Sequence, residues 1–229
     1  IPGIFEENPQ LSSVREYINF AKSGYEEPMN THADHFITNA AYNVASYVKG
    51  SVFLEELKYI IGEESFNKGM LRFFNTWKFK HPNDNDFIRI MEKVSGMELD
   101  WFKEYFVNST RTIDYEIEEM RGRELILRRV GLMPMPLDIT VKLKDGTTKQ
   151  YYVPIDLMRA TKPGDKYFNT FKTIHPWPWV SPTFSFYIDN VVTDIDIVEI
   201  DASQRLADID RSNNVWPRPM ESKAIQTDR

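Results

Sequence analysis

The chain has 229 residues, of which 41% are hydrophobic and 14% aromatic, enough for one or two folded domains and too many for low-complexity disorder. Its net charge of -6 argues against the basic face that nucleic-acid binding requires, so we expect no nucleic acid among its partners. The chain has no cysteine for a disulfide or thiolate metal site, and no apolar run approaches the roughly 20 residues of a membrane span.

The first 110 residues are predicted to be helical. Apolar positions recur at helical spacing from Leu11 to Ala21, and a long helix is predicted from about Ile37 to Ile61, with Gly62 as its C-cap. An aromatic-rich amphipathic helix follows over residues 66–77, and His81-Pro82 breaks it. Two shorter helices are predicted around residues 87–94 and 100–106.

Beyond about Thr112 the apolar residues alternate, as they do in strands with one buried face. The alternation covers residues 113–117, 137–143, 151–153, 184–188 and 195–200, and Asp145-Gly146 is a hairpin signal. Short strands at this spacing predict a small antiparallel β-sandwich. The predicted fold class is therefore α+β in two parts, with a helical bundle over residues 1–110, a β-sandwich over 111–202 and a polar tail over 203–229, loose from Met220 onward.

The sequence offers little to bind a metal or to act as a nucleophile. No H-E-x-x-H zinc helix is present, and His32 and His35, three residues apart, are better interpreted as loop or helix-cap residues than as ligands. The segment Asp208–Ser212 resembles the start of a calcium loop, but Pro219 stands where the bidentate carboxylate would have to be. Serine-nucleophile and phosphate-loop motifs are also missing from the sequence.

The most informative stretch is Tyr42–Gly50, within the long predicted helix. Two tyrosines five residues apart on a half-apolar helix are most often core or interface residues, with a catalytic role as the alternative. Gly50 costs the helix about 1 kcal/mol relative to alanine, which predicts a close backbone approach at that position.

Four segments follow one another in a specific order and spacing: Tyr47-Val48-Lys49-Gly50, Ile61-Gly62-Glu63-Glu64-Ser65-Phe66, Asp86-Phe87-Ile88-Arg89-Ile90-Met91-Glu92 and Leu99-Asp100-Trp101-Phe102. Together they resemble the gluzincin aminopeptidases, the family of aminopeptidase N. The resemblance extends from Tyr42 to about Tyr115, and it implies that the region after Thr112 is the immunoglobulin-like scaffolding domain that follows the catalytic domain in that family.

By this resemblance Tyr47 is the catalytic tyrosine and Tyr42 a second tyrosine near the active site that contacts substrate. In such zinc enzymes a zinc-bound water attacks the scissile carbonyl, and a neutral phenol can donate a hydrogen bond to the oxyanion that forms. The resemblance thus implies zinc as cofactor of the full-length enzyme and peptides as its substrates.

The sequence departs from the family in important ways. Val48 stands where many members have glutamate, and the zinc-binding segment, the later glutamate ligand and the Gly-x-Met-Glu-Asn segment are all absent. In the family these lie N-terminal to the tyrosine. We therefore expect the chain to be a fragment that holds no zinc, is inactive alone, and partners a missing N-terminal zinc-binding region of the same polypeptide. Such enzymes occur in the cytoplasm and the periplasm, and a periplasmic or extracellular location is slightly favoured over a cytoplasmic one.

Two other functions remain open. The chain could be a non-catalytic module of helices and β-sandwich that binds protein or glycan near Trp177, Trp179 and Phe184, although tryptophans beside prolines usually pack a loop onto a sheet. It could also be a degenerate, non-catalytic member of the aminopeptidase family.

Overall fold

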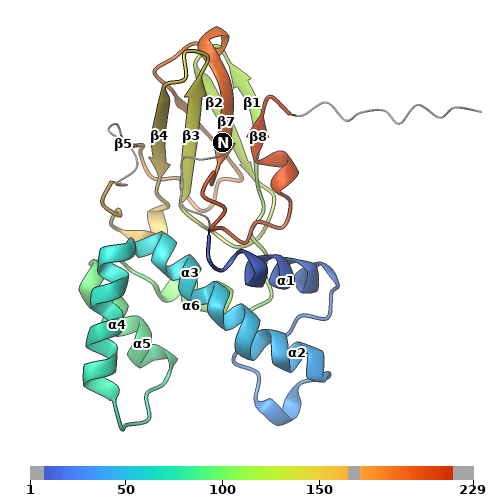
Figure 1. The fold of residues 1–229 in the computed structure, drawn as a ribbon, viewed down its shortest axis with the longest axis vertical. Helices are drawn as coiled ribbons and strands as arrows, with labels where there is room; N and C mark the ends of the chain where they lie inside the picture. The colour runs from blue at the N-terminus through green and yellow to red at the C-terminus, as the bar shows by residue number, and fades with distance from the viewer. Residues whose placement is uncertain (1–7, 165–170, 219–229) are drawn as a thin grey trace, which may run out of the picture.

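The computed structural model describes residues 8–164 and 171–218, and the helices gather at one end of the molecule (Figure 1). They are α1 (Leu11–Lys22), the 3-10 turn η1 (Ala33–His35), α2 (Asn39–Asn43), the π turn η2 (Val44–Val48), α3 (Lys49–Ile61), α4 (Glu63–Trp77), α5 (Asp84–Ser95) and α6 (Asp100–Phe106). No helix in the described ranges is both long and apolar enough to cross a bilayer.

The helix boundaries follow from local chemistry. Thr38 caps α2 by accepting the Ala41 N–H, and Asn83 and Asp86 form a reciprocal capping box at the start of α5. Gly62 ends α3 at a φ of 83°, which a residue without a Cβ adopts at little cost. The predicted long helix is present as α2, η2 and α3 in succession, with a π turn that the periodicity did not indicate.

Two sheets form the other end of the molecule. One has the strand order β1-β2-β6 and the other β5-β4-β3-β7-β8. Their bounds are β1 (Tyr115–Arg121), β2 (Glu124–Arg129), β3 (Leu137–Leu143), β4 (Thr148–Val153), β5 (Phe171–Thr173), β6 (Thr183–Tyr187), β7 (Ile195–Ile200) and β8 (Val215–Trp216), with 3-10 turns η3 (Asp156–Met158), η4 (Val192–Asp194) and η5 (Arg211–Asn213).

The sheets pack through their inner faces. The Tyr151 ring on β4 lies 5.8 Å from the Phe186 ring on β6. The pairs are antiparallel except β4 with β5, which is parallel. The predicted fold class, helices followed by a β-sandwich, is confirmed, and the parallel edge pair is a departure from a purely antiparallel sandwich.

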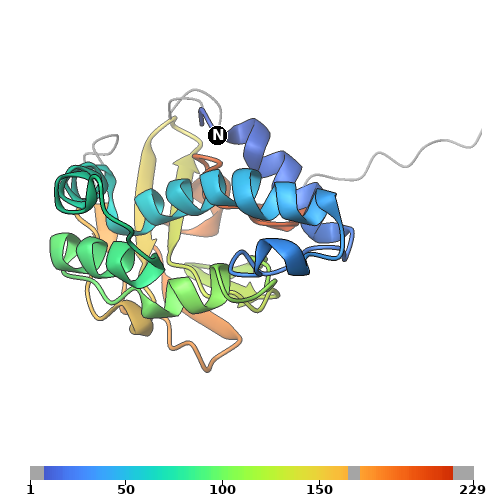
Figure 2. The ribbon, with the colours of Figure 1, turned by 90° about the horizontal axis from the view of Figure 1, so that it is seen from below.

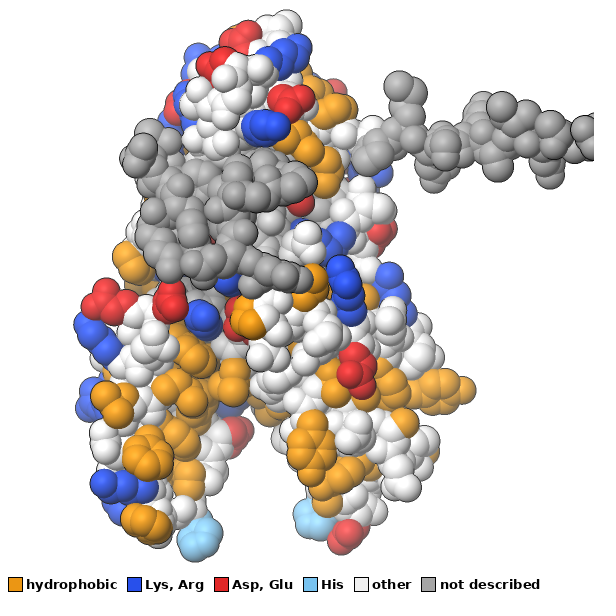
Figure 3. All heavy atoms as spheres, in the orientation of Figure 1, with side chains coloured by type: hydrophobic (Ala, Val, Ile, Leu, Met, Phe, Trp, Pro, Cys, Tyr) orange, Lys and Arg blue, Asp and Glu red, His pale blue; other side chains and the backbone are white. Residues whose placement is uncertain are grey.

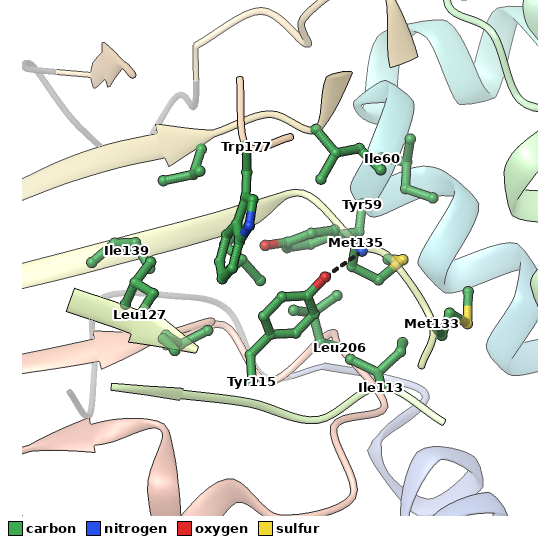
Figure 4. Packing of buried hydrophobic residues seen from close by; sticks show 14 of the residues in the cluster. Tyr59, Ile60, Ile113, Tyr115, Leu127, Met133, Met135, Ile139, Trp177 and Leu206 are labelled. Atoms are coloured by element: carbon green, nitrogen blue, oxygen red, sulfur yellow. Dashed lines mark hydrogen bonds between the residues drawn. The ribbon is translucent and has the colours of Figure 1, made fainter. Parts of the chain in front are cut away.

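Helix α3 joins the two ends through one continuous apolar core (Figures 2 and 4). The Tyr59 hydroxyl on α3 accepts the Asp138 backbone N–H of β3 at 2.8 Å. The Lys162 ammonium lies 4.2 Å from the Tyr59 ring centroid and 2.6 Å from the Asp138 carboxylate. On the sheet side, the Tyr115 hydroxyl accepts the Met135 N–H at 2.8 Å (Figure 4).

The predicted polar tail needs a correction over residues 203–218. Leu206 and Ala207 are fully buried, and β8 adds a strand to the larger sheet. The Ala207 N–H donates to the Glu56 carboxylate of α3 at 2.6 Å, and Arg211 pairs with the buried Asp201 at 3.0 Å. These contacts tie the segment into the core because its few apolar side chains and its backbone find partners there. The residues from Met220 onward lie outside the described part of the chain, as do Ile1–Ile4.

Glu56 is a fully buried acid of this junction. Burial raises the pKa of its carboxyl well above the usual range, with the charges of Asp201, Glu55 and Asp208 adding to the effect, while the Ala207 N–H opposes it. Burial likewise raises the pKa of Asp208 to about 6. The junction between α3 and the C-terminal segment is therefore more stable when Glu56 carries a proton.

We predict that Tyr59→Phe lowers the free energy of unfolding by about 1–3 kcal/mol, because the buried Asp138 N–H would lose its acceptor. Urea unfolding of the protein gives the value. Tyr187→Phe on β6 is the matched control, since that side chain is 68% exposed, and we expect a change within about 0.5 kcal/mol. Equal effects of the two substitutions would contradict the role of Tyr59 in joining helix to sheet.

We predict that Glu56→Gln stabilises the protein at pH 8 and that this gain shrinks as the pH falls to 4.5. Because the pKa of Glu56 is higher in the folded than in the unfolded state, the wild type has its full stability when Glu56 is protonated. The wild type loses stability as the pH rises through the folded-state pKa. Each unit by which the pKa of Glu56 in the folded state exceeds that in the unfolded state costs about 1.4 kcal/mol. The amide is neutral throughout and keeps an oxygen for the Ala207 N–H. Urea titrations at both pH values measure the difference, and a pH-independent difference would refute a protonated Glu56.

Candidate functional site

The π turn η2 changes the direction of the side chains around Tyr47. The Lys49 N–H bonds to the Val44 carbonyl five residues back, instead of four as in an α-helix. In a regular α-helix, residues five apart point about 140° away from each other. The wider turn reduces this angle between Tyr42 and Tyr47, while Val44 still faces the core. Single π turns in helices occur frequently at functional sites.

Both predicted site tyrosines lie on the surface. Tyr47 is 66% exposed and Tyr42 is 39% exposed. The Tyr42 ring packs edge-on against the Phe36 ring at 5.5 Å, which fixes its orientation on one side. No hydrogen bond reaches the Tyr47 hydroxyl from residues 8–164 or 171–218, so this hydroxyl can donate to a group that approaches from outside. The roles assigned to the two tyrosines stay predictions.

Lys49 lies at the C-terminal end of this turn. The sequence did not indicate that its charge is buried in an ion pair. Its side chain is 1% exposed, and its ammonium contacts the Glu26 carboxylate at 2.6 Å and the Ser109 carbonyl at 3.1 Å. Burial lowers the pKa of Lys49, and the charge of Glu26 opposes that shift. The pairing was not predictable because Glu26 lies 23 residues away on a loop.

Gly50 does not make the close contact that its position in a helix predicted. A Cβ built on this residue would have no atom within 4 Å among the described residues. The prediction was therefore wrong for this chain taken by itself: the glycine leaves open space beside the tyrosine-bearing turn.

The histidines form no metal centre. The rings of His32 and His35 lie 5.3 Å apart on the exposed turn η1, and His32 Nδ1 accepts the Asp34 N–H as a helix cap. Within the part of the chain that the structure describes, no three histidine or carboxylate side chains are grouped to hold a metal. The Asp208 carboxylate is occupied by N–H donors from Tyr115, Asp210 and Asn214.

The tryptophan loop, the alternative binding region, is turned inward. Trp177 is 2% exposed, stacks on Phe184 at 5.1 Å, and donates its indole N–H to the Ser181 carbonyl. Trp179 is half-buried between the Arg129 guanidinium, 3.7 Å from its ring centroid, and the Tyr105 ring at 5.4 Å. These rings pack the loop onto the sheet and onto α6, so they offer little surface to a sugar or peptide.

The helical end has an open apolar face. Figure 3 shows two arms separated by an opening, with hydrophobic side chains exposed on the arm that contains α4 and α5. The sequence predicted an aromatic-rich amphipathic helix here, and the only residue of α4 that is buried is Gly69. Exposed large apolar side chains of this end are Tyr25, Ile37, Tyr42, Tyr47, Leu71, Phe74 and Phe79. Apolar surface gathered in this way is typical of a protein interface.

The helical part of the chain is similar to a known protein family. Residues 5–106 match the peptidase family M1 domain. The predicted resemblance to the gluzincin aminopeptidases is confirmed.

Two curated aminopeptidases match the chain. Aminopeptidase N of Escherichia coli K12 is 30% identical over 101 residues, which are 42% of this chain and 12% of that protein. Glutamyl aminopeptidase of the viper Bitis rhinoceros is 26% identical over 153 residues, 59% of this chain and 16% of that protein. The chain thus spans less than a fifth of the length of either relative.

A solved structure of Legionella pneumophila aminopeptidase A, in complex with aspartic acid, aligns with 76% of this chain and 18% of its own, at 17% identity and a TM-score of 0.49.

We predict that the 229-residue chain takes up no stoichiometric zinc, because two imidazoles on an exposed turn lack the further ligands of a zinc site. Calorimetric titration with zinc, repeated on the His32→Ala/His35→Ala variant, tests this. Both should give the same weak signal. Tight one-to-one uptake that disappears in the variant would establish a metal site that the geometry does not support.

Proposed function

We propose that this chain is part of a zinc aminopeptidase that removes N-terminal residues from peptides. In this proposal residues 1–110 are the C-terminal part of the catalytic domain, and the sandwich from residue 111 onward is an immunoglobulin-like scaffold. The observation that carries the proposal is Tyr47: the residue that matches the catalytic tyrosine of the family is exposed, without a hydrogen-bond partner in the described chain, on a π turn.

Tyr47 would stabilise the transition state. A phenol with a pKa of about 10 is neutral at pH 7 and can donate its proton in a hydrogen bond. As the scissile carbonyl becomes tetrahedral, negative charge develops on its oxygen, and a donor aimed at that oxygen binds the transition state more strongly than the substrate. This interaction raises kcat rather than affinity alone.

Tyr42 would contact the substrate. Its ring is held edge-on by Phe36, so it offers one exposed side close to the same turn. A half-exposed aromatic ring of fixed orientation suits packing against a substrate side chain or backbone, and we assign it no role in proton transfer.

Zinc would be held outside this chain. The described residues do not fit the metal, because they contain no group of three ligands. We therefore place zinc on another region of the polypeptide that docks against the apolar helical face, which explains why so many large side chains there are exposed. It follows that the chain alone would be inactive.

We predict that Tyr47→Phe in the intact enzyme lowers kcat by about 10²–10³-fold, the equivalent of ~2.7–4 kcal/mol, while zinc content stays unchanged. Steady-state hydrolysis of an aminoacyl substrate and metal analysis of the same preparation supply the two measurements. Tyr187→Phe, on the exposed face of β6, should leave kcat unchanged. If Tyr47→Phe behaved like Tyr187→Phe, Tyr47 would be an interface residue without catalytic effect.

A further inference from the structure

We infer that the buried ion pair of Lys49 and Glu26 is a positioning device that sets the direction of the Tyr47 side chain. The inference rests on the function proposed above for Tyr47, and it makes Lys49 and Glu26 positioning residues rather than catalytic ones. Neither residue lies on the exposed surface that a substrate would reach, since their side chains are 1% and 5% exposed.

The Lys49 ammonium is enclosed by polar acceptors and aromatic rings. It donates to the Glu26 carboxylate at 2.6 Å and to the Ser109 carbonyl at 3.1 Å. The rings of Tyr17 and Phe106 lie with their centroids 5.7 Å and 5.2 Å from it. A charge in such a place requires its partner, because an ammonium without one would lose its hydration without compensation.

The same residue closes the π turn. The Lys49 N–H donates to the Val44 carbonyl, so the side chain and the backbone of Lys49 both fix the end of the turn. Tyr47 lies two residues before it. Without the ion pair of Lys49, the π turn could relax to an α-helix, in which hydrogen bonds span four residues instead of five. A shift of one residue in the hydrogen-bond register would rotate Tyr47 by about 100° relative to the side of the helix that faces the core.

The Glu26 end is anchored as firmly. The Met29 N–H of this loop donates to the Val107 carbonyl at the end of α6, at 2.9 Å. The Ile37 N–H donates to the Glu27 carboxylate at 2.9 Å, which joins the two ends of the loop. This loop also carries Phe36, the residue that packs against Tyr42. The loop that supplies Glu26 therefore contacts Tyr42 through Phe36 and holds the turn of Tyr47 through Lys49.

The test uses the full polypeptide that contains this chain and the variant Glu26→Gln, which keeps the shape of the side chain but leaves the Lys49 charge without its counter-charge. Hydrogen–deuterium exchange is measured over residues 44–49, and kcat and KM are measured separately. We expect exchange in the turn to become about tenfold faster or more, with exchange in α5 unchanged, and kcat to fall by a similar factor with little change in KM.

Three further variants make the result specific. Glu64→Gln breaks an exposed pair with Lys68 on α4, whose side chains are 76% and 66% exposed, and should change neither exchange nor kcat. In a Tyr47→Phe background, Glu26→Gln should lower kcat no further, because the hydroxyl that the pair positions is already gone. The double variant Glu26→Gln/Lys49→Met buries no unpaired charge and so keeps the fold, yet it should still show fast exchange in the turn and low kcat.

Normal exchange in the turn with normal kcat, in Glu26→Gln or in the double variant, would overturn the inference. An equal loss of kcat from Glu26→Gln with and without the Tyr47 hydroxyl would also overturn it, since the pair would then act elsewhere. If Tyr47→Phe alone left kcat unchanged, the proposed function would fail. Faster exchange in Glu26→Gln would in that case still support the conclusion that the ion pair stabilises the π turn.

Discussion

A positive charge enclosed among aromatic rings ties α1, α6 and the loop of Glu26 to the start of α3. The Lys49 ammonium needs a counter-charge inside the protein, and Glu26 supplies it from the loop between α1 and α2. Pairing them brings the loop between α1 and α2 against the end of α6. The position of the tyrosine-bearing turn is thus decided by where a charge can be buried, in addition to the packing of apolar side chains.

Helix α3 has a second task, because its other end lies on the β-sandwich. The Tyr59 hydroxyl and the Glu56 carboxylate accept backbone N–H groups from β3 and from the C-terminal segment. Helix α3 therefore follows directly on the tyrosine-bearing turn at its start and forms the junction with the sheets toward its end. In the proposed scaffolding role, the sandwich would support the tyrosine-bearing turn through its contacts with α3.

The sequence indicated most elements of the fold, because their signals are local. Gly62 as a C-cap, the Asn83 capping box and the alternation of β3 each depend on a few neighbouring residues. The fold class was predictable for the same reason. In the candidate site, Tyr47 could be found by its motif, and the exposed position of its side chain is compatible with the predicted role.

What the sequence did not indicate depends on distant partners. The π turn is a matter of hydrogen-bond register, which apolar periodicity does not report. The Lys49–Glu26 pair and the Glu56–Ala207 contact join residues 23 and 151 positions apart. The short segment with Leu206 and Ala207 looked polar, since two small apolar side chains among charges give no pattern. The exposure of α4 was not predictable either, because an amphipathic pattern does not say which partner covers the apolar face.

The Glu56–Ala207 contact also has a consequence for biosynthesis. A ribosome makes Glu56, on α3, 151 residues before it makes Ala207, whose backbone N–H donates to the Glu56 carboxylate. At roughly 5–20 residues per second, that interval lasts on the order of ten seconds or more. During that interval the nascent α3 can pack against the other helices, but the end of α3 that meets the sheets lacks this contact until Ala207 has been translated.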